Sequence, residues 1–151
     1  MEFKITLNVN KESGDLLPFN YQYEQSAVIY RILAQADTQY ASWLHENGYQ
    51  LNGHKRFKLF CYSPFIFDKV RPLPESGCLK IMDERAVWHI SFIPEKSTLE
   101  FIQGIFAHQS FTIGNKELRV AFDVVGVEAM SMPQLSEDMT FQALSPICVK
   151  Q

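Results

Sequence analysis

The order of periodic segments in this sequence predicts an α+β fold, in which helices cover one face of an antiparallel sheet. Residues 2–10 alternate apolar and polar side chains, which is the period-two pattern of a half-buried strand. Residues 22–35 instead place apolar side chains three and four positions apart, which is the pattern of a helix with one buried face. Residues 95–108 repeat the helical spacing later in the chain.

The first half of the chain is expected to hold one strand and two helices. Residues 11–20, which include one glycine and one proline, predict a loop after the first strand. Asp37 is expected to cap a second short helix with the sequence TQYASWLHE, because its carboxylate can accept a hydrogen bond from the first helical turn. An Asn-Gly pair follows that segment and would end the helix.

The second half is expected to supply the remaining strands. Residues 57–63 are rich in aromatic side chains and predict a strand. Residues 78–82 and 86–93 predict a hairpin around the turn at 83–85. Pro94 opens the next helix at a position where proline is tolerated, since its missing N–H is not needed there.

The last elements complete a recognisable order. A turn at 114–115 leads to a long strand over 117–130, and the tail 139–150 predicts one or two further short strands. The order strand, helix, strand, strand, helix, strand is the split βαβ, ferredoxin-like arrangement. We therefore expect a four-stranded antiparallel sheet with helices on one face, formed by residues 1–151 as one domain.

Composition narrows the classes of function. Hydrophobic residues make up 46% of the sequence and charged residues 21%, so a core can form and disorder is not expected. The formal net charge is −3, whereas a free-standing nucleic-acid-binding domain usually carries a basic excess. Binding to nucleic acid would therefore depend on a local basic patch.

Cysteine usage and hydropathy bear on the compartment. Cys61, Cys78 and Cys148 form no CxxC pair, so neither a zinc site nor a disulfide framework is predicted. Free thiols fit a reducing cytoplasm. The first residues show no signal-peptide pattern, and no apolar run approaches the roughly 18 residues that span a membrane. We expect a soluble cytoplasmic protein that does not contact membranes.

Four stretches together carry a resemblance to a known family. They are LPFNYQYEQSAVIYRIL (17–33), SWLHENGY (42–49), FKLFCYS (57–63) and LSPICV (144–149). In this order and spacing the sequence resembles the metal-independent endoribonucleases that cut CRISPR precursor transcripts within each repeat. These enzymes belong to the repeat-associated RNA-binding superfamily and contain two ferredoxin-like domains in tandem. The resemblance covers nearly the whole chain, but only the first domain of the family.

The resemblance implies three catalytic residues, which are Tyr30, His45 and Lys58. It implies attack by a ribose 2′-OH on the adjacent phosphodiester, giving a 2′,3′-cyclic phosphate and a 5′-OH without a metal or cofactor. The residue types suit that chemistry: histidine exchanges protons near neutral pH, and lysine offsets negative charge on phosphate. Tyr30 would orient the 2′-OH or share in proton transfer. Outside the family context, His45 would be a dipole partner at a helix end and Tyr30 the edge of a core.

The resemblance also implies contacts with CRISPR repeat RNA, and CRISPR effector subunits are candidate partners. The densest basic run lies at 54–58, and two further cations follow at 69 and 71. As RNA-binding residues, these would contact the phosphate backbone beside the cut site. The residues assigned this role are Lys55, Arg56, Lys69 and Arg71. The alternative is a solvated loop, which is the usual environment of a short charge run. His89 and His108 are expected to be a packed or surface histidine and a helix cap.

The sequence departs from the family pattern at its glycines. The family carries a glycine-rich loop in its second domain, whereas the seven glycines here are scattered and form no GxG. We therefore expect this domain to hold the cleaving residues and still bind and cut RNA weakly by itself. Two other functions stay open, namely a non-catalytic CRISPR RNA-binding or assembly subunit and a ferredoxin-like domain that binds a metabolite or a partner protein.

Overall fold

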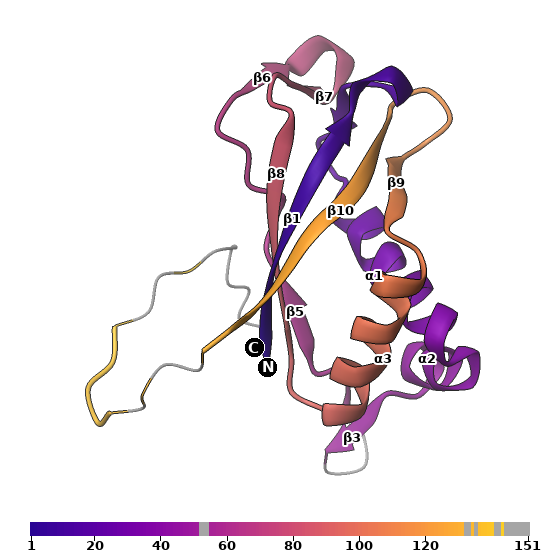
Figure 1. Cartoon of the computed structure of the whole chain (residues 1–151), viewed down its shortest axis with the longest axis vertical. Helices are drawn as coiled ribbons and strands as arrows, with labels where there is room; N and C mark the ends of the chain where they lie inside the picture. Colours follow the sequence, from indigo (N-terminus) through magenta and orange to yellow (C-terminus); the bar gives the residue numbers. More distant parts are fainter. Residues whose placement is uncertain (52–54, 132–133, 135, 141–142, 144–151) are drawn as a thin grey trace.

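The computed structural model describes residues 1–51, 55–131, 134, 136–140 and 143. Within this part of the chain, five strands form one antiparallel sheet with the order β5-β8-β1-β10-β9 (Figure 1). The strands are β1 (Glu2–Asn10), β5 (Phe60–Tyr62), β8 (Arg85–Phe92), β9 (Ser110–Gly114) and β10 (Arg119–Met130). Between β1 and β10 the register shifts after Thr6, so that Val125 bulges out of the ladder.

Within the described residues, the α-helices lie on the same side of this sheet (Figure 1). They are α1 (Gln22–Ala36), α2 (Thr38–Glu46) and α3 (Glu95–Ala107). No helix within the described residues is long and apolar enough to cross a membrane. The predicted order of strand, helix, strand, strand, helix, strand is present as β1, α1, β5, β8, α3 and β10. The ferredoxin-like prediction is therefore confirmed.

The core lies between the helices and the sheet, and the period-two strands build it. Alternate side chains of β1 and β8 face the helices and are buried. Helix α3 lies very close to α1 at Gly104. A Cβ on that residue would lie 1.8 Å from the carbonyl oxygen of Ile32. The largest fully buried side chains are Trp88, Phe92, Phe101, Phe122, Ile5, Leu7, Leu17, Ile29, Leu33, Leu44, Ile81 and Ile90.

The predicted hairpin of 78–82 with 86–93 is wrong. Strand β7 (Cys78–Ile81) pairs instead with β6 (Val70–Leu73) and β2 (Leu16–Pro18) in a separate three-stranded sheet. The turn between β7 and β8 is held by the side chain of Asp83, which accepts a hydrogen bond from the Lys69 N–H at 2.6 Å. Beyond that turn, β8 pairs with β1 and β5 in the larger sheet.

Two other predicted segments differ in detail. The predicted loop at 11–20 contains the short 3₁₀ helix η1 (Lys11–Ser13) as well as β2. The predicted strand at 57–63 is divided, because Leu59 adopts a left-handed φ of 56° between β4 (Lys55–Phe57) and β5. Strand β4 pairs with β3 (Tyr49–Leu51), a strand that was not predicted. A second 3₁₀ helix, η2 (Pro74–Ser76), precedes β7.

The prediction of short strands within 139–150 falls mostly on residues outside the described part. Positions 139, 140 and 143 are described and lie in no strand. Strand β9 adds an edge strand that the sequence pattern did not indicate. It pairs with β10 only from Arg119 to Asp123.

The close approach of α1 and α3 gives the first testable prediction. Gly104→Ala would force a Cβ against the Ile32 carbonyl, so the helices must separate, and we expect a loss of about 2–4 kcal/mol in the free energy of unfolding. Gly126→Ala is the matched control, since its Cβ would meet Thr6 at an ordinary 3.6 Å. Urea denaturation of both variants measures the difference, and equal midpoints would contradict the prediction.

Candidate active site

Helix α2 starts at the side chain predicted to cap it. Asp37 has extended backbone angles, and its Oδ1 accepts a hydrogen bond from the Tyr40 N–H at 2.8 Å. Its Oδ2 lies 3.1 Å from Nζ of Lys96 at the start of α3. The pKa of Asp37 is lowered, first by the hydrogen bond from Tyr40 and then by Lys96. The cap therefore also ties α2 to α3.

A buried tyrosine adds a second link between the same helices. The hydroxyl of Tyr40 shares a short hydrogen bond with Ser97 Oγ in α3 and a 3.0 Å hydrogen bond with the hydroxyl of Tyr49 in β3. Burial raises the pKa of Tyr40 well above its ordinary value. Nζ of Lys96 lies 4.7 Å from the centre of the Tyr40 ring. These contacts fix the orientation of α2 and hence the direction in which its last turn points.

The last turn of α2 carries His45, and α1 brings Tyr30 to it. The two rings meet edge to face, with centroids 5.0 Å apart and planes at 82°. His45 is exposed and Tyr30 is half-buried. Burial, with a smaller contribution from Tyr62, raises the pKa of Tyr30. Tyr30 therefore keeps its proton at neutral pH.

Lys58 returns to the same helix end after the β3–β4 hairpin. Gly48 makes the turn with a φ of 66°, and a Cβ there would lie 2.7 Å from the Phe57 carbonyl oxygen. Nζ of Lys58 donates hydrogen bonds to the carbonyl oxygens of both Leu44 and His45. Its pKa is lowered, first by desolvation and then by the neighbouring charge of Arg56.

The structure thus brings Tyr30, His45 and Lys58 together at the C-terminal end of α2, and we refer to these three residues as the candidate site. The end of a helix favours cations because its last carbonyl groups are unpaired. Arg56 joins the cluster through a 3.0 Å hydrogen bond from Nη1 to the Glu46 carbonyl oxygen. The catalytic roles of the three residues stay predictions.

The residues expected to bind RNA do not form one patch. Arg56 adjoins the candidate site, and Lys55 begins β4 in the same hairpin. Lys69 and Arg71 are exposed beside and on β6, which lies at the opposite end of the molecule from α2 and β3 (Figure 1). That separation follows from the small β2-β7-β6 sheet, which the sequence pattern did not predict.

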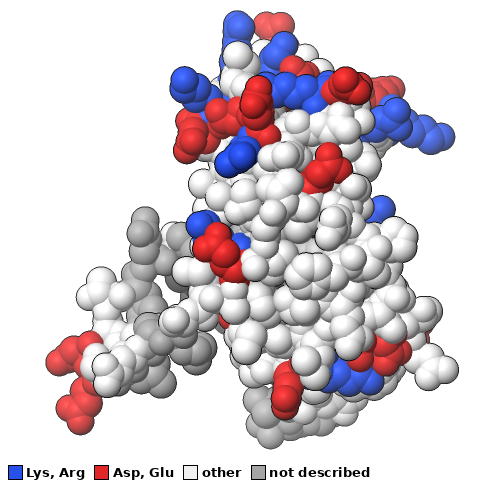
Figure 2. Space-filling model, viewed as in Figure 1, with Lys and Arg blue, Asp and Glu red and all other residues white. Residues whose placement is uncertain are grey.

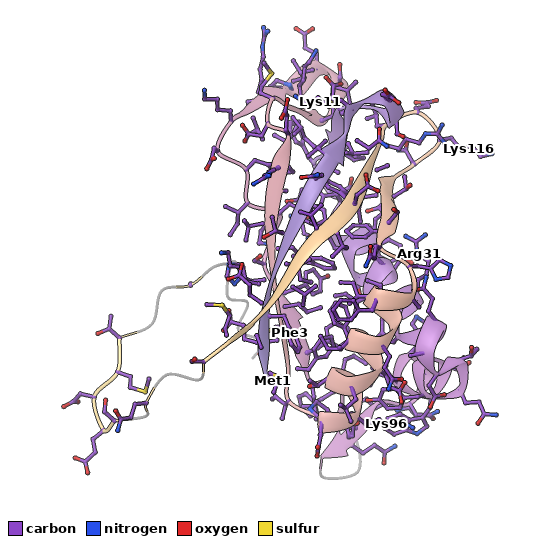
Figure 3. All side chains as sticks on the ribbon, viewed as in Figure 1. Met1, Phe3, Lys11, Arg31, Lys96 and Lys116 are labelled. Atoms are coloured by element: carbon purple, nitrogen blue, oxygen red, sulfur yellow. The ribbon has the colours of Figure 1, made fainter. Side chains whose placement is uncertain are left out.

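The end of the molecule that carries β6 and β7 has charges of both signs. Figure 2 shows Lys and Arg side chains mixed with Asp and Glu there, and Lys11 and Lys116 project from that end in Figure 3. Lys80 and Asp15 form an ion pair at 3.5 Å. Mixed charges of this kind give no uniformly basic surface at that end.

Two aromatic residues beside the candidate site were missed by sequence reasoning. Phe60 meets Tyr30 edge to face at 5.7 Å, and Tyr62 donates a 2.9 Å hydrogen bond from its hydroxyl to the Gln22 carbonyl oxygen. They occupy alternate positions of β5 and so share the face that packs toward α1. The period-two spacing of Phe60 and Tyr62 indicates that they share one face of the strand. No sequence pattern indicated that this face packs toward α1.

Of the histidines in the described part of the chain, His89 and His108 lie apart from the candidate site. His89 is on β8, where its Nδ1 is 3.1 Å from Glu2 Oε1. His108 follows α3 as its C-cap, with its N–H donating to the Gly104 carbonyl oxygen at 3.2 Å. Among the described residues, no three His, Cys, Asp or Glu side chains are grouped as ligands for a metal ion.

Several known proteins are similar to this chain. CRISPR-associated endoribonuclease Cas6 1 of Methanocaldococcus jannaschii is 24% identical over 147 residues, which are 97% of this chain and 52% of that protein. A solved structure described as a Cas6-related gene from Pyrococcus furiosus matches with a TM-score of 0.71 and 23% identity, over 90% of this chain and 50% of that one. Another, described as an RAMP protein binding different RNA substrates, matches with a TM-score of 0.69 and 22% identity, over 91% and 51%.

The fold and the matching family together show the class of this protein. The strand order and the helical layer define a ferredoxin-like α+β domain, and the solved structures share that fold. The family described as CRISPR-associated protein Cas6, N-terminal, matches residues 16–123, which is well over half of the chain. The chain therefore belongs to the Cas6 family, as the sequence resemblance implied. It spans about half the length of the relatives that it matches.

The ion pair at the start of α2 predicts a pH dependence. Because the pKa of Asp37 is lowered in the folded state, its charge contributes stability above the ordinary carboxyl pKa, and that contribution is lost as the pH falls through the folded pKa. Asp37→Asn keeps a capping oxygen but removes the charge. We expect a lower Tm for this variant at pH 7 and a gap that closes below about pH 4. Thermal melts at pH 7 and pH 3 test this, and a gap of constant size would contradict it.

Proposed function

We propose that this chain supplies the catalytic half of a metal-independent endoribonuclease that cuts CRISPR repeat RNA. The observation that carries the proposal is the meeting of Tyr30, His45 and Lys58 at one helix end, in a chain of the Cas6 family. A relative named as a CRISPR-associated endoribonuclease matches 97% of the chain. RNA is accordingly the proposed substrate and binding partner.

The proposed reaction is an internal transfer at one phosphodiester. The 2′ oxygen forms a bond to phosphorus while the bond from phosphorus to the 5′ oxygen of the next nucleotide breaks. The 2′-OH gives up its proton, and the leaving 5′ oxygen receives one. His45 is exposed, and histidine is a side chain that can serve as general acid or general base near neutral pH. The products are a 2′,3′-cyclic phosphate and a 5′-OH.

Tyr30 and Lys58 have different parts in this proposal. The raised pKa of Tyr30 favours a hydroxyl that stays protonated and orients a ribose oxygen by hydrogen bonding. Lys58 holds its ammonium beside the backbone of His45, where a bound phosphate would meet it. A positive charge at that point stabilises the extra negative charge of the transition state. Arg56 adds a second cation to the same helix end.

We further propose that the complete enzyme has a second domain. Matched relatives are about twice as long as this chain, and the RNA surface would then be shared between two halves. Among the described side chains, Lys58 and Arg56 lie at the candidate site, whereas Lys69 and Arg71 lie at the other end of the molecule. The 151-residue chain alone is therefore expected to bind and cut repeat RNA weakly.

The decisive test removes the proposed proton carrier. In the complete protein that carries this chain, His45→Ala should slow single-turnover cleavage of the cognate repeat RNA by roughly 10²–10⁴-fold, the usual contribution of a positioned general acid or base. RNA affinity should change little, because phosphate contacts dominate binding. His89→Ala is the matched control, since His89 lies on β8 and pairs with Glu2. Cleavage is measured on denaturing gels with a chelator present. Cleavage by His45→Ala at the native rate would exclude the mechanism.

Tyr30→Phe separates the two roles open to Tyr30. The variant keeps the ring that packs against His45 but loses the hydroxyl, so an orienting role predicts a cleavage rate about 2- to 10-fold lower, as expected for one hydrogen bond. A loss as large as that of His45→Ala would instead assign Tyr30 to proton transfer. The rates are compared at saturating protein over a range of pH.

A further inference from the structure

An aromatic surface runs from the candidate site along α1. Tyr30 touches His45 at one side and Phe60 at the other, with ring centroids 5.0 Å and 5.7 Å apart. The ring of Phe60 stacks at 6.3 Å on Tyr62. The hydroxyl of Tyr62 in turn reaches the first turn of α1, where it donates to the Gln22 carbonyl oxygen. These ring contacts therefore end beside the residue that follows Gln22 in α1, which is Tyr23.

That residue, Tyr23, is a tyrosine with 81% of its surface exposed. Tyr23 and Tyr30 are seven positions apart and therefore lie on the same face of α1, about 10 Å from each other along the helix axis. Ala27 lies between them and is exposed, so its small side chain leaves the space between the two rings open. A ring exposed this fully contributes little to the core, because burial is what makes an aromatic side chain stabilising.

This face suits a nucleic acid strand, because it has cations at one end and uncharged aromatic rings at the other. Lys58 and Arg56 lie at the candidate site. Between Tyr23 and Tyr30 the sequence contains one carboxylate, Glu24, which is half-buried and projects about 100° around the helix from Tyr23. Within the described residues of α1, the face shared by Tyr23 and Tyr30 therefore presents no carboxylate between the two rings.

We propose that Tyr23 is a stacking site for an unpaired base of the RNA, one or two nucleotides from the phosphodiester held at His45. This inference rests on the proposed function and adds a subsite to it. Bases stack on tyrosine rings with little dependence on sequence, because every base has a flat π face. Tyr23 is thus a binding residue outside the reacting groups, and it sets how the strand leaves the candidate site.

The test compares three variants of the complete protein on its cognate repeat RNA. Tyr23→Ala should weaken RNA binding by about 5- to 150-fold, the range for loss of one stacked base. Tyr23→Phe keeps the stacking ring and should stay within about 2-fold of the native affinity. Phe106→Ala is the control for loss of an exposed aromatic side chain, because Phe106 is 61% exposed but lies on α3. It should bind RNA as the native protein does.

A second set of RNAs identifies the stacked base. Abasic substitutions are placed singly at the nucleotides that flank the cut, and one of them should weaken binding to native protein and to Tyr23→Phe, while adding little to the defect of Tyr23→Ala. The loss should appear in the concentration needed for half-maximal cleavage more than in the rate at saturation, since Tyr23 contacts none of the reacting groups.

The outcomes separate the subsite from the proposed function. If native protein binds and cuts the repeat but Tyr23→Ala binds it equally well, the stacking site is refuted while the proposed function stands. Loss of binding to a protein subunit without change in RNA affinity would also refute it, by assigning Tyr23 to a protein interface. If native protein neither binds nor cuts the repeat, the proposed function fails and this inference fails with it.

Discussion

The contact between the backbones of α1 and α3 is the constraint on which the candidate site depends. With glycine at position 104, α3 can lie against the Ile32 carbonyl. The start of α3 then holds α2 through Lys96 and Ser97, which contact Asp37 and Tyr40. Because α1 carries one member of the site and α2 another, a shift of α3 would move the two rings relative to each other. Packing far from the reacting groups thereby sets a contact within the site.

The end of α2 combines a structural function with a proposed chemical one. Unpaired carbonyl groups at a helix end attract cations, and Lys58 and Arg56 satisfy three of them. The same cations supply the positive charge that a phosphate would need. The left-handed backbone at Leu59 follows directly and turns the chain into β5. Backbone of this kind is costly for leucine and persists where the surrounding structure determines it.

The sequence predicted what local periodicity and capping chemistry control. The faces of β1, β8, α1 and α3 and the cap at Asp37 follow from the spacing of side chains along single elements. The small β2-β7-β6 sheet and the position of Lys69 and Arg71 depend on long-range pairing, which no local pattern specifies. Tyr30, His45 and Lys58 came from the family resemblance, whereas Phe60 and Tyr62 required knowledge of which helix β5 faces.

The hydrogen bonds of Lys58 have a consequence for selectivity among ligands. An ammonium group has three N–H donors, and two of those on Lys58 are bound to carbonyl oxygens, so one N–H is left for a ligand. A neutral hydroxyl or amide would gain one ordinary hydrogen bond from it. A phosphodiester oxygen would gain a charge-assisted hydrogen bond, which is stronger. The resting contacts of Lys58 thus favour anionic ligands over neutral polar ones.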